Sequence, residues 1–165
     1  MHQRWKPSVT VAAVIEQQGR FLMVEEHTPE GLRLNNPAGH LDPAESPAQG
    51  CSREVLEETA YAFTPTFLVG LYLSRFQRQR ADGLEDVTYL RFAYAGTLGA
   101  LDAQRTLDTG IERTVWLSAD EMRASQARHR SPLVLQCMED YLRGQRYPLE
   151  LIYADASLWQ PQVSL

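Results

Sequence analysis

Three glutamates, Glu54, Glu57 and Glu58, are spaced to place their carboxylates on one face of a helix. With Glu54 at zero and about 100° per residue, Glu58 falls at about 40° and Glu57 at about 300°. Carboxylates that lie so close together repel one another unless a positive group lies among them. Mg²⁺ takes oxygen ligands and supplies that charge. Any one glutamate alone is more often a solvated surface residue, but the joint pattern indicates a metal site.

Two neighbouring features strengthen this interpretation. The run Pro37-Ala38-Gly39 predicts a loop whose backbone can approach a ligand or metal closely, and Glu45 and Arg53 frame the start of the helix. Arg53 is placed to pair with a carboxylate and hold it in position, as the residues behind metal ligands usually do.

The helix that would carry the glutamates has clear start signals. Ser46 is a capping residue, Pro47 suits the first helical position, and Gln49 completes a capping box. We expect this helix to run to about Ala60. Its remaining residues, which include Ala48, Cys51, Val55 and Leu56, supply an apolar stripe for packing.

The rest of the chain predicts strands interleaved with short helices. Strands are expected over 9–16, 20–26, 63–74, 87–98 and 113–117, with a tight turn at 17–19 and loops over 28–43 and 77–86. A capping box from Ser118 to Glu121 predicts a short helix, and Ser131-Pro132 begins another that Gly144 can end. The fold class is therefore α/β or α+β, with a mixed sheet.

Composition limits the remaining possibilities. The 165 residues are 44% hydrophobic and 22% charged, which is ordinary globular usage and predicts a single domain over residues 1–165. The longest early apolar run, 9–15, is too short to span a membrane. Two cysteines, Cys51 and Cys137, are interpreted as buried thiols in a reducing cytoplasm. A net charge of −5 argues against nucleic-acid binding.

The spacing from Gly39 through Glu45 and the run Arg53-Glu54-Val55-Leu56-Glu57-Glu58 to Ala60-Tyr61 resembles the box of the Nudix family, G-x5-E-x7-R-E-U-x-E-E-x-G-U. The chain departs from it at Ala60, where the box has glycine, and at Tyr61, where an aliphatic residue is usual. In the preceding loop, Ala38 and Leu34 replace the commoner Gly and Trp. The resemblance implies an α/β/α sandwich around a mixed sheet.

Further segments resemble a phosphatase branch of the same family: Pro37-Ala38-Gly39-His40-Leu41, Leu90-Arg91-Phe92, Arg130-Ser131-Pro132-Leu133-Val134 and Gly144-Gln145-Arg146-Tyr147-Pro148-Leu149-Glu150. This resemblance implies Mg²⁺-dependent removal of phosphate from hydroxymethylpyrimidine pyrophosphate, thiamine pyrophosphate and nucleoside di- or triphosphates. The alternatives are a hydrolase of nucleotide sugars or related nucleotides, and a catalytically silent module that binds a ligand or RNA.

The resemblance also implies roles for individual residues. Glu54, Glu57 and Glu58 would hold Mg²⁺, with Mn²⁺ as an alternative, together with the carbonyl of Gly39. The attacking water would give its proton to one of the helix glutamates or to Glu112. The partner is a small pyrophosphate compound, with no nucleic acid and no membrane, and the chain is expected to be a monomer or a homodimer.

Two more residues are candidates for substrate binding. Arg91 alternates with apolar residues in a strand, where it either reaches a substrate phosphate or forms a structural pair. His40 follows the loop glycine, where it either contacts substrate or is held by structural hydrogen bonds. Arg75, Arg78 and Arg80 are interpreted as part of a solvated hairpin loop.

Overall fold

The amino-terminal strands form around the predicted tight turn. The computed structural model describes residues 4–160, beginning with β1 (Ser8–Val14), β2 (Glu16–Gln17) and β3 (Arg20–Thr28). Gln18 and Gly19 both have positive φ values, as a two-residue hairpin turn requires. This confirms the expected hairpin.

The prediction of a continuous loop over 28–43 was wrong. The segment contains β4 (Gly31–Asn35) and β5 (Ala38–His40). β4 pairs with β3, and β5 pairs with β1, both antiparallel. The Pro and Gly residues of this segment predict local breaks, whereas the backbone hydrogen bonds that make these short strands come from partners elsewhere in the chain.

The helix α1 (Pro47–Thr59) follows the sequence signals closely. Ser46 is the N-cap, and its capping box with Gln49 is formed in both directions. At the other end Ala60 adopts the left-handed conformation, with a φ of 62°. Glycine is favoured in this conformation, which explains the glycine of the box. Ala60 adopts the same conformation, so the turn is kept despite the substitution.

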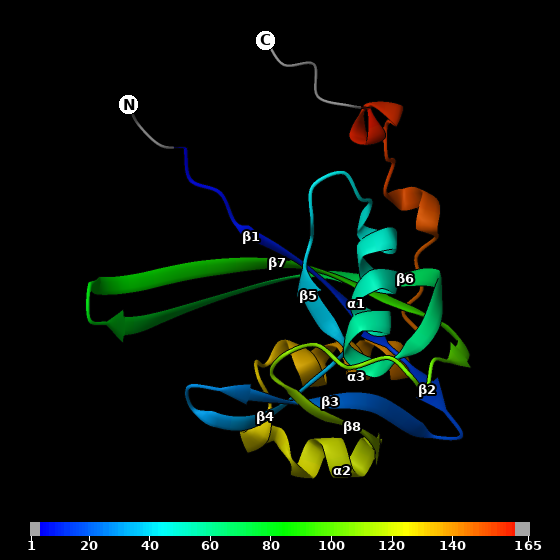
Figure 1. The fold of residues 1–165 in the computed structure, drawn as a ribbon, viewed down its shortest axis with the longest axis horizontal. Helices are drawn as coiled ribbons and strands as arrows, with labels where there is room; N and C mark the ends of the chain where they lie inside the picture. Colours follow the sequence, from blue (N-terminus) through cyan, green and yellow to red (C-terminus); the bar gives the residue numbers. More distant parts are fainter. Residues whose placement is uncertain (1–3, 161–165) are drawn as a thin grey trace.

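The central hairpin is longer than predicted. β6 (Tyr61–Arg80) and β7 (Gly83–Leu101) pair antiparallel almost to the turn, so the loop expected over 77–86 is largely strand. Cross-strand ion pairs accompany this pairing: Arg75 contacts Asp86, and Glu85 contacts both Arg78 and Arg80. Figure 1 shows that the tip of this hairpin projects beyond the other strands.

The carboxyl-terminal part of the chain supplies one more strand and the remaining helices. β8 (Ile111–Ser118) is followed by α2 (Ala119–Ala124), whose capping box from Ser118 to Glu121 is formed as predicted. α3 (Leu133–Leu142) ends before Gly144, which has a φ of 81°. Three short 3₁₀ helices span Gln126–Arg128, Leu149–Leu151 and Ala156–Trp159.

The strands form two sheets that meet at β1. One has the order β5-β1-β7-β6, with β1 and β7 parallel. In the other, β3 pairs with β2 near its start, with β4 toward its end, and with β8 along most of its length. Backbone hydrogen bonds from Leu22 to Ile15 and from Ala13 to Pro37 join the two sheets. This confirms the expected mixed α/β architecture (Figure 1).

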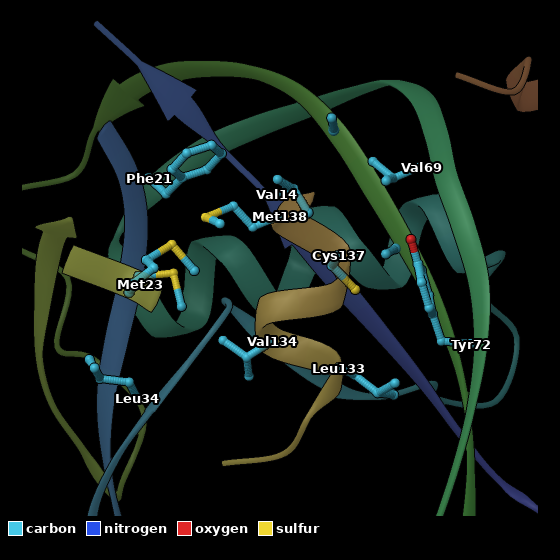
Figure 2. Close-up of a cluster of buried hydrophobic side chains, with 13 residues drawn as sticks. Val14, Phe21, Met23, Leu34, Val69, Tyr72, Leu133, Val134, Cys137 and Met138 are labelled. Carbon is cyan, nitrogen blue, oxygen red and sulfur yellow. The ribbon is translucent and has the colours of Figure 1, made fainter. Parts of the chain in front are cut away.

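Two apolar clusters show how the helices pack on the sheets. Cys51 and Val55 of α1 pack with Val11, Ala13 and their neighbours. Val134, Cys137 and Met138 of α3 pack with Val14, Phe21, Met23 and others, as Figure 2 shows. Alternate residues of β1 thus face α1 and α3, which gives the layered sandwich.

Both cysteines are free and buried, as expected. Within residues 4–160, no helix combines the length and apolar character needed to cross a membrane.

Candidate active site

Arg53 is the centre of the carboxylate cluster. Its Nε and Nη2 donate to the two oxygens of Glu45 at 3.0 and 2.7 Å. Its Nη1 donates to Glu54 at 2.7 Å and to Glu57 at 2.9 Å, and Nη2 also reaches the carbonyl of His40 at 3.0 Å. One planar guanidinium therefore fixes three carboxylates and the end of β5.

Glu45 also secures the entry to the helix. Its carboxylate accepts a hydrogen bond from the backbone N–H of Asp42 at 2.7 Å. The hydrogen bonds from Arg53 are the main reason that the pKa of Glu45 lies below its usual value. Glu45 is thus an ionised support for Arg53.

The side chain of Glu58 contacts the first residue of β5. Its Oε2 accepts the backbone N–H of Ala38 at 2.9 Å, and the side chain is buried. Burial raises the pKa of Glu58 to about 8, and the carboxylates of Glu54, Glu26 and Asp108 add to that shift. Burial also raises the pKa of Glu54, against the lowering effect of Arg53. Without a bound cation the protonated form of Glu58 is therefore favoured, and a cation among these carboxylates would favour the ionised form instead.

Gly39 is in contact with the cluster. A Cβ atom at this position would lie 2.2 Å from the carboxyl carbon of Glu54. Only a residue without a side chain lets the β5 backbone approach this carboxylate so closely. The structure thus brings together Gly39, Arg53, Glu54, Glu57 and Glu58, all of which the sequence singled out.

Asp108 is a member of this site that sequence reasoning missed. Its backbone N–H donates to the carbonyl of Glu57 at 3.0 Å, which ties the segment before β8 to the end of α1. Its charge raises the pKa values of both Glu54 and Glu58. No local pattern marks Asp108, because its position depends on a contact about fifty residues away along the chain.

Glu112 has a different environment. Its carboxylate contacts the ring of His27 at 2.8 Å, and both side chains are more than half exposed. The hydrogen bonds found for Glu112 do not involve α1. The structure therefore gives Glu112 no direct link to the helix glutamates.

The donor set fits a divalent cation. Glu54, Glu57, Glu58 and Asp108 supply oxygen ligands of the kind that Mg²⁺ and Mn²⁺ bind. Burial disfavours the charged forms of Glu54 and Glu58 unless a cation compensates. Among the described residues, no three acidic, His or Cys side chains already converge as a finished metal site. Arg53 bonds one oxygen of Glu54 and one oxygen of Glu57, which leaves the second oxygen of each carboxylate available to a metal.

A cavity of about 520 Å³ opens beside Ala38, Gly39 and His40. This volume is typical of small-molecule sites. Phe76 and Tyr89 lie in its wall with their rings stacked 5.7 Å apart, and the His40 ring lies 6.0 Å from that of Tyr89. Arg91 also lines the cavity. Both candidate substrate-binding residues thus face one cavity next to the carboxylates.

Comparisons with known proteins agree with this geometry. The NUDIX domain model matches residues 4–137. Phosphatase NudJ of Escherichia coli K12 is 36% identical over 149 residues, which cover 90% of this chain and 92% of the relative, and the same values hold for Phosphatase NudJ of Shigella sonnei.

Solved structures give the same result. A NUDIX hydrolase from Nitrosomonas europaea is 53% identical, has a TM-score of 0.80, and is matched over 91% of this chain and 98% of that one. A MutT NUDIX hydrolase from Burkholderia pseudomallei shares the fold, with a TM-score of 0.65, 19% identity, and coverage of 82% and 98%. The chain therefore belongs to the NUDIX hydrolase family.

Proposed function

We propose that this enzyme removes the terminal phosphate from small organic diphosphates in a reaction that depends on Mg²⁺ or Mn²⁺. The proposed substrates are hydroxymethylpyrimidine pyrophosphate, thiamine pyrophosphate and nucleoside di- and triphosphates. One observation carries the proposal: a cluster of glutamates around Arg53 adjoins a cavity lined by aromatic rings and Arg91. The similarity to Phosphatase NudJ supports the same choice.

The proposed roles follow from the contacts. Glu54, Glu57 and Glu58, with Asp108 and the Gly39 carbonyl, would hold the metal. A bound divalent ion would neutralise the diphosphate and lower the pKa of an attacking water. Arg53 and Glu45 keep the carboxylates in place, so they act as positioning residues.

The hydrolysis step is a simple displacement. A water oxygen bonds to the terminal phosphorus, the bridging P–O bond breaks, and the organic monophosphate leaves with the bridging oxygen. The water proton passes to a carboxylate. We assign this base to the helix glutamates, since Glu112 is engaged by His27, and Glu112 is the alternative to be tested.

The cavity would hold the organic part of the substrate. Phe76 and Tyr89 offer flat apolar surfaces on which an aromatic ring can stack. His40 and Arg91 would supply polar contacts. A cavity of this size suits a pyrimidine, a thiazolium or a nucleoside, which supports a broad set of substrates.

A cytoplasmic location is part of the proposal. Both thiols are free and buried in the described part of the chain, which suits a reducing compartment.

The test is a panel of pyrophosphate compounds incubated with Mg²⁺. We expect orthophosphate and a monophosphate from thiamine pyrophosphate and from nucleoside diphosphates. Rapid cleavage of ADP-ribose, with no orthophosphate from any diphosphate, would favour a nucleotide-sugar hydrolase. If every compound stays intact with Mg²⁺ and with Mn²⁺, the silent binding module is correct instead.

A further inference from the structure

Arg91 is a buried arginine with unmet hydrogen-bonding capacity. Only 7% of the residue is exposed, and its Nε and Nη1 have no hydrogen-bond partner. No carboxylate among the described residues forms an ion pair with it, whereas Arg130 in the same cavity pairs with Glu26 at 3.2 Å. Leaving buried N–H groups unpaired is costly, so Arg91 is not explained as a structural pair.

Arg91 belongs to a row of residues that crosses the sheet. Thr10 pairs with His40 on one side and with Arg91 on the other. Directly opposed residues point to the same face, and all three line the cavity. With neighbouring strands about 4.8 Å apart, Arg91 lies roughly 10 Å from His40 across the row. A substrate whose phosphates lie near Gly39 would therefore present its opposite, non-phosphate end to Arg91.

Two other polar atoms of the cavity are also unpartnered. Thr10 Oγ1 and Asn35 Oδ1 are buried and have no hydrogen-bond partner. The guanidinium can only donate, the amide oxygen only accepts, and the hydroxyl does both. Together the three side chains suit a ligand that presents acceptors and a donor.

We propose that Arg91, Thr10 and Asn35 form a polar subsite that binds the edge of a nitrogen heterocycle at the non-phosphate end of the substrate. Ring nitrogen or carbonyl acceptors would receive N–H groups of Arg91, and an amino or ring N–H group would donate to Asn35. The stacked rings of Phe76 and Tyr89 lie in the same cavity and suit a planar ligand. Aminopyrimidines have such an edge. This inference rests on the proposed function, because it assumes that the phosphates lie at the carboxylate cluster.

The test measures binding of two monophosphates by calorimetry in the presence of Mg²⁺. Cytidine 5′-monophosphate carries the heterocycle, and ribose 5-phosphate lacks it. We expect the wild-type protein to bind the nucleotide roughly tenfold or more tightly than the sugar phosphate. Arg91→Met and Asn35→Leu should each remove most of that difference by weakening nucleotide binding alone, since one hydrogen bond to a charged group accounts for about such a factor. Arg20→Met, outside the cavity, is the matched control and should change neither affinity.

Thermal unfolding supplies a second readout. Because Nε and Nη1 of Arg91 make no hydrogen bond in the free protein, Arg91→Met should unfold at the same or a higher temperature than the wild type. A clear drop in that temperature would show that Arg91 is structural and would overturn the proposal.

The binding data can overturn it in two further ways. Equal weakening of both ligands by Arg91→Met would mean that Arg91 holds a phosphate. Equal affinity of the wild-type protein for both ligands would mean that no heterocycle subsite exists. Neither result requires turnover, so a protein that discriminates between the ligands but hydrolyses no diphosphate would contradict the proposed function alone.

Discussion

The backbone of Gly39 lies directly against the carboxylate of Glu54, so close that a Cβ atom on residue 39 would be 2.2 Å from the carboxyl carbon and from Oε1. β5 and α1 are thereby fixed at a separation that only glycine permits. The contact places the backbone of β5 against a helix carboxylate, which is one of the proposed metal ligands.

Gly39→Ala should displace Glu54 and disturb the site. We expect turnover to fall by at least about tenfold and the free energy of unfolding to fall by roughly 1–3 kcal/mol, the usual cost of overpacking. Steady-state kinetics and denaturant unfolding measure the two effects. Gly99→Ala is the control, since a Cβ there would contact only Ala62, with its methyl at 3.2 Å and its carbonyl oxygen at 3.6 Å, and the position is exposed. Normal activity of Gly39→Ala would show that Glu54 moves without consequence.

The helix glutamates should be required for catalysis and not for folding. Glu57→Gln and Glu58→Gln should each lower kcat by about 100-fold or more, beyond the loss expected for residues that only support a metal ligand. The fold should survive, because Glu57→Gln relieves repulsion between carboxylates, and the amide oxygen introduced by Glu58→Gln can still accept the N–H of Ala38. Kinetics at saturating Mg²⁺ and circular dichroism test this. A variant with near-normal turnover would remove that residue from the metal site.

Glu112→Gln distinguishes the two proposed bases. Because Glu112 contacts His27 and is exposed, the variant should keep kcat within about threefold of the wild type, far from the loss of about 100-fold or more expected when a general base is removed. The pH dependence of kcat should also stay unchanged. A large loss of rate, together with loss of the acidic limb of the profile, would assign the base to Glu112.

Arg53→Lys should slow the reaction while leaving KM nearly unchanged. Lysine keeps the charge but cannot form the paired contacts to Glu45, Glu54 and Glu57. Misplaced carboxylates harm the transition state more than ground-state binding, so we expect kcat to fall about 10–100-fold. A large rise in KM at constant kcat would instead place Arg53 on the substrate.

Glu25 makes the stability depend on pH. This buried carboxylate accepts hydrogen bonds from Arg113 at 2.7 Å and from Arg128 at 2.5 Å, and these bonds lower its pKa. A lowered pKa in the folded state stabilises the protein above the usual pKa of glutamate, and this contribution is lost as the pH falls through the folded-state value.

Glu25→Gln should therefore lower the free energy of unfolding by about 1–3 kcal/mol at neutral pH. The wild type and the variant should converge in acid, where Glu25 itself becomes protonated. Urea unfolding at a series of pH values measures this difference. If the free energies of unfolding of the wild type and the variant differ by the same amount from neutral to acidic pH, the charge of Glu25 contributes nothing to stability.

The sequence by itself determined the helix and which of its carboxylates share one face. The cap at Ser46, the start at Pro47 and the spacing of Glu54, Glu57 and Glu58 all depend on the geometry of a few consecutive turns. That geometry is the same in any helix, so residue spacing is enough to predict which carboxylates share a face. The capping box before α2 was predictable for the same reason.

The tertiary structure decided everything that depends on pairing between distant segments. Local signals predicted strands over 63–74 and 87–98, but they did not predict β4 and β5 or the extension of β6 and β7 toward the hairpin turn. The hydrogen bonds of these segments come from partners across the sheet. Asp108 joined the site through a contact with Glu57. Arg91 likewise lies buried, with Nε and Nη1 unpartnered, because β7 pairs with β1, which in turn pairs with β5. The partners of a charged side chain depend on which strands lie beside its own, and the order of the strands depends on the whole chain.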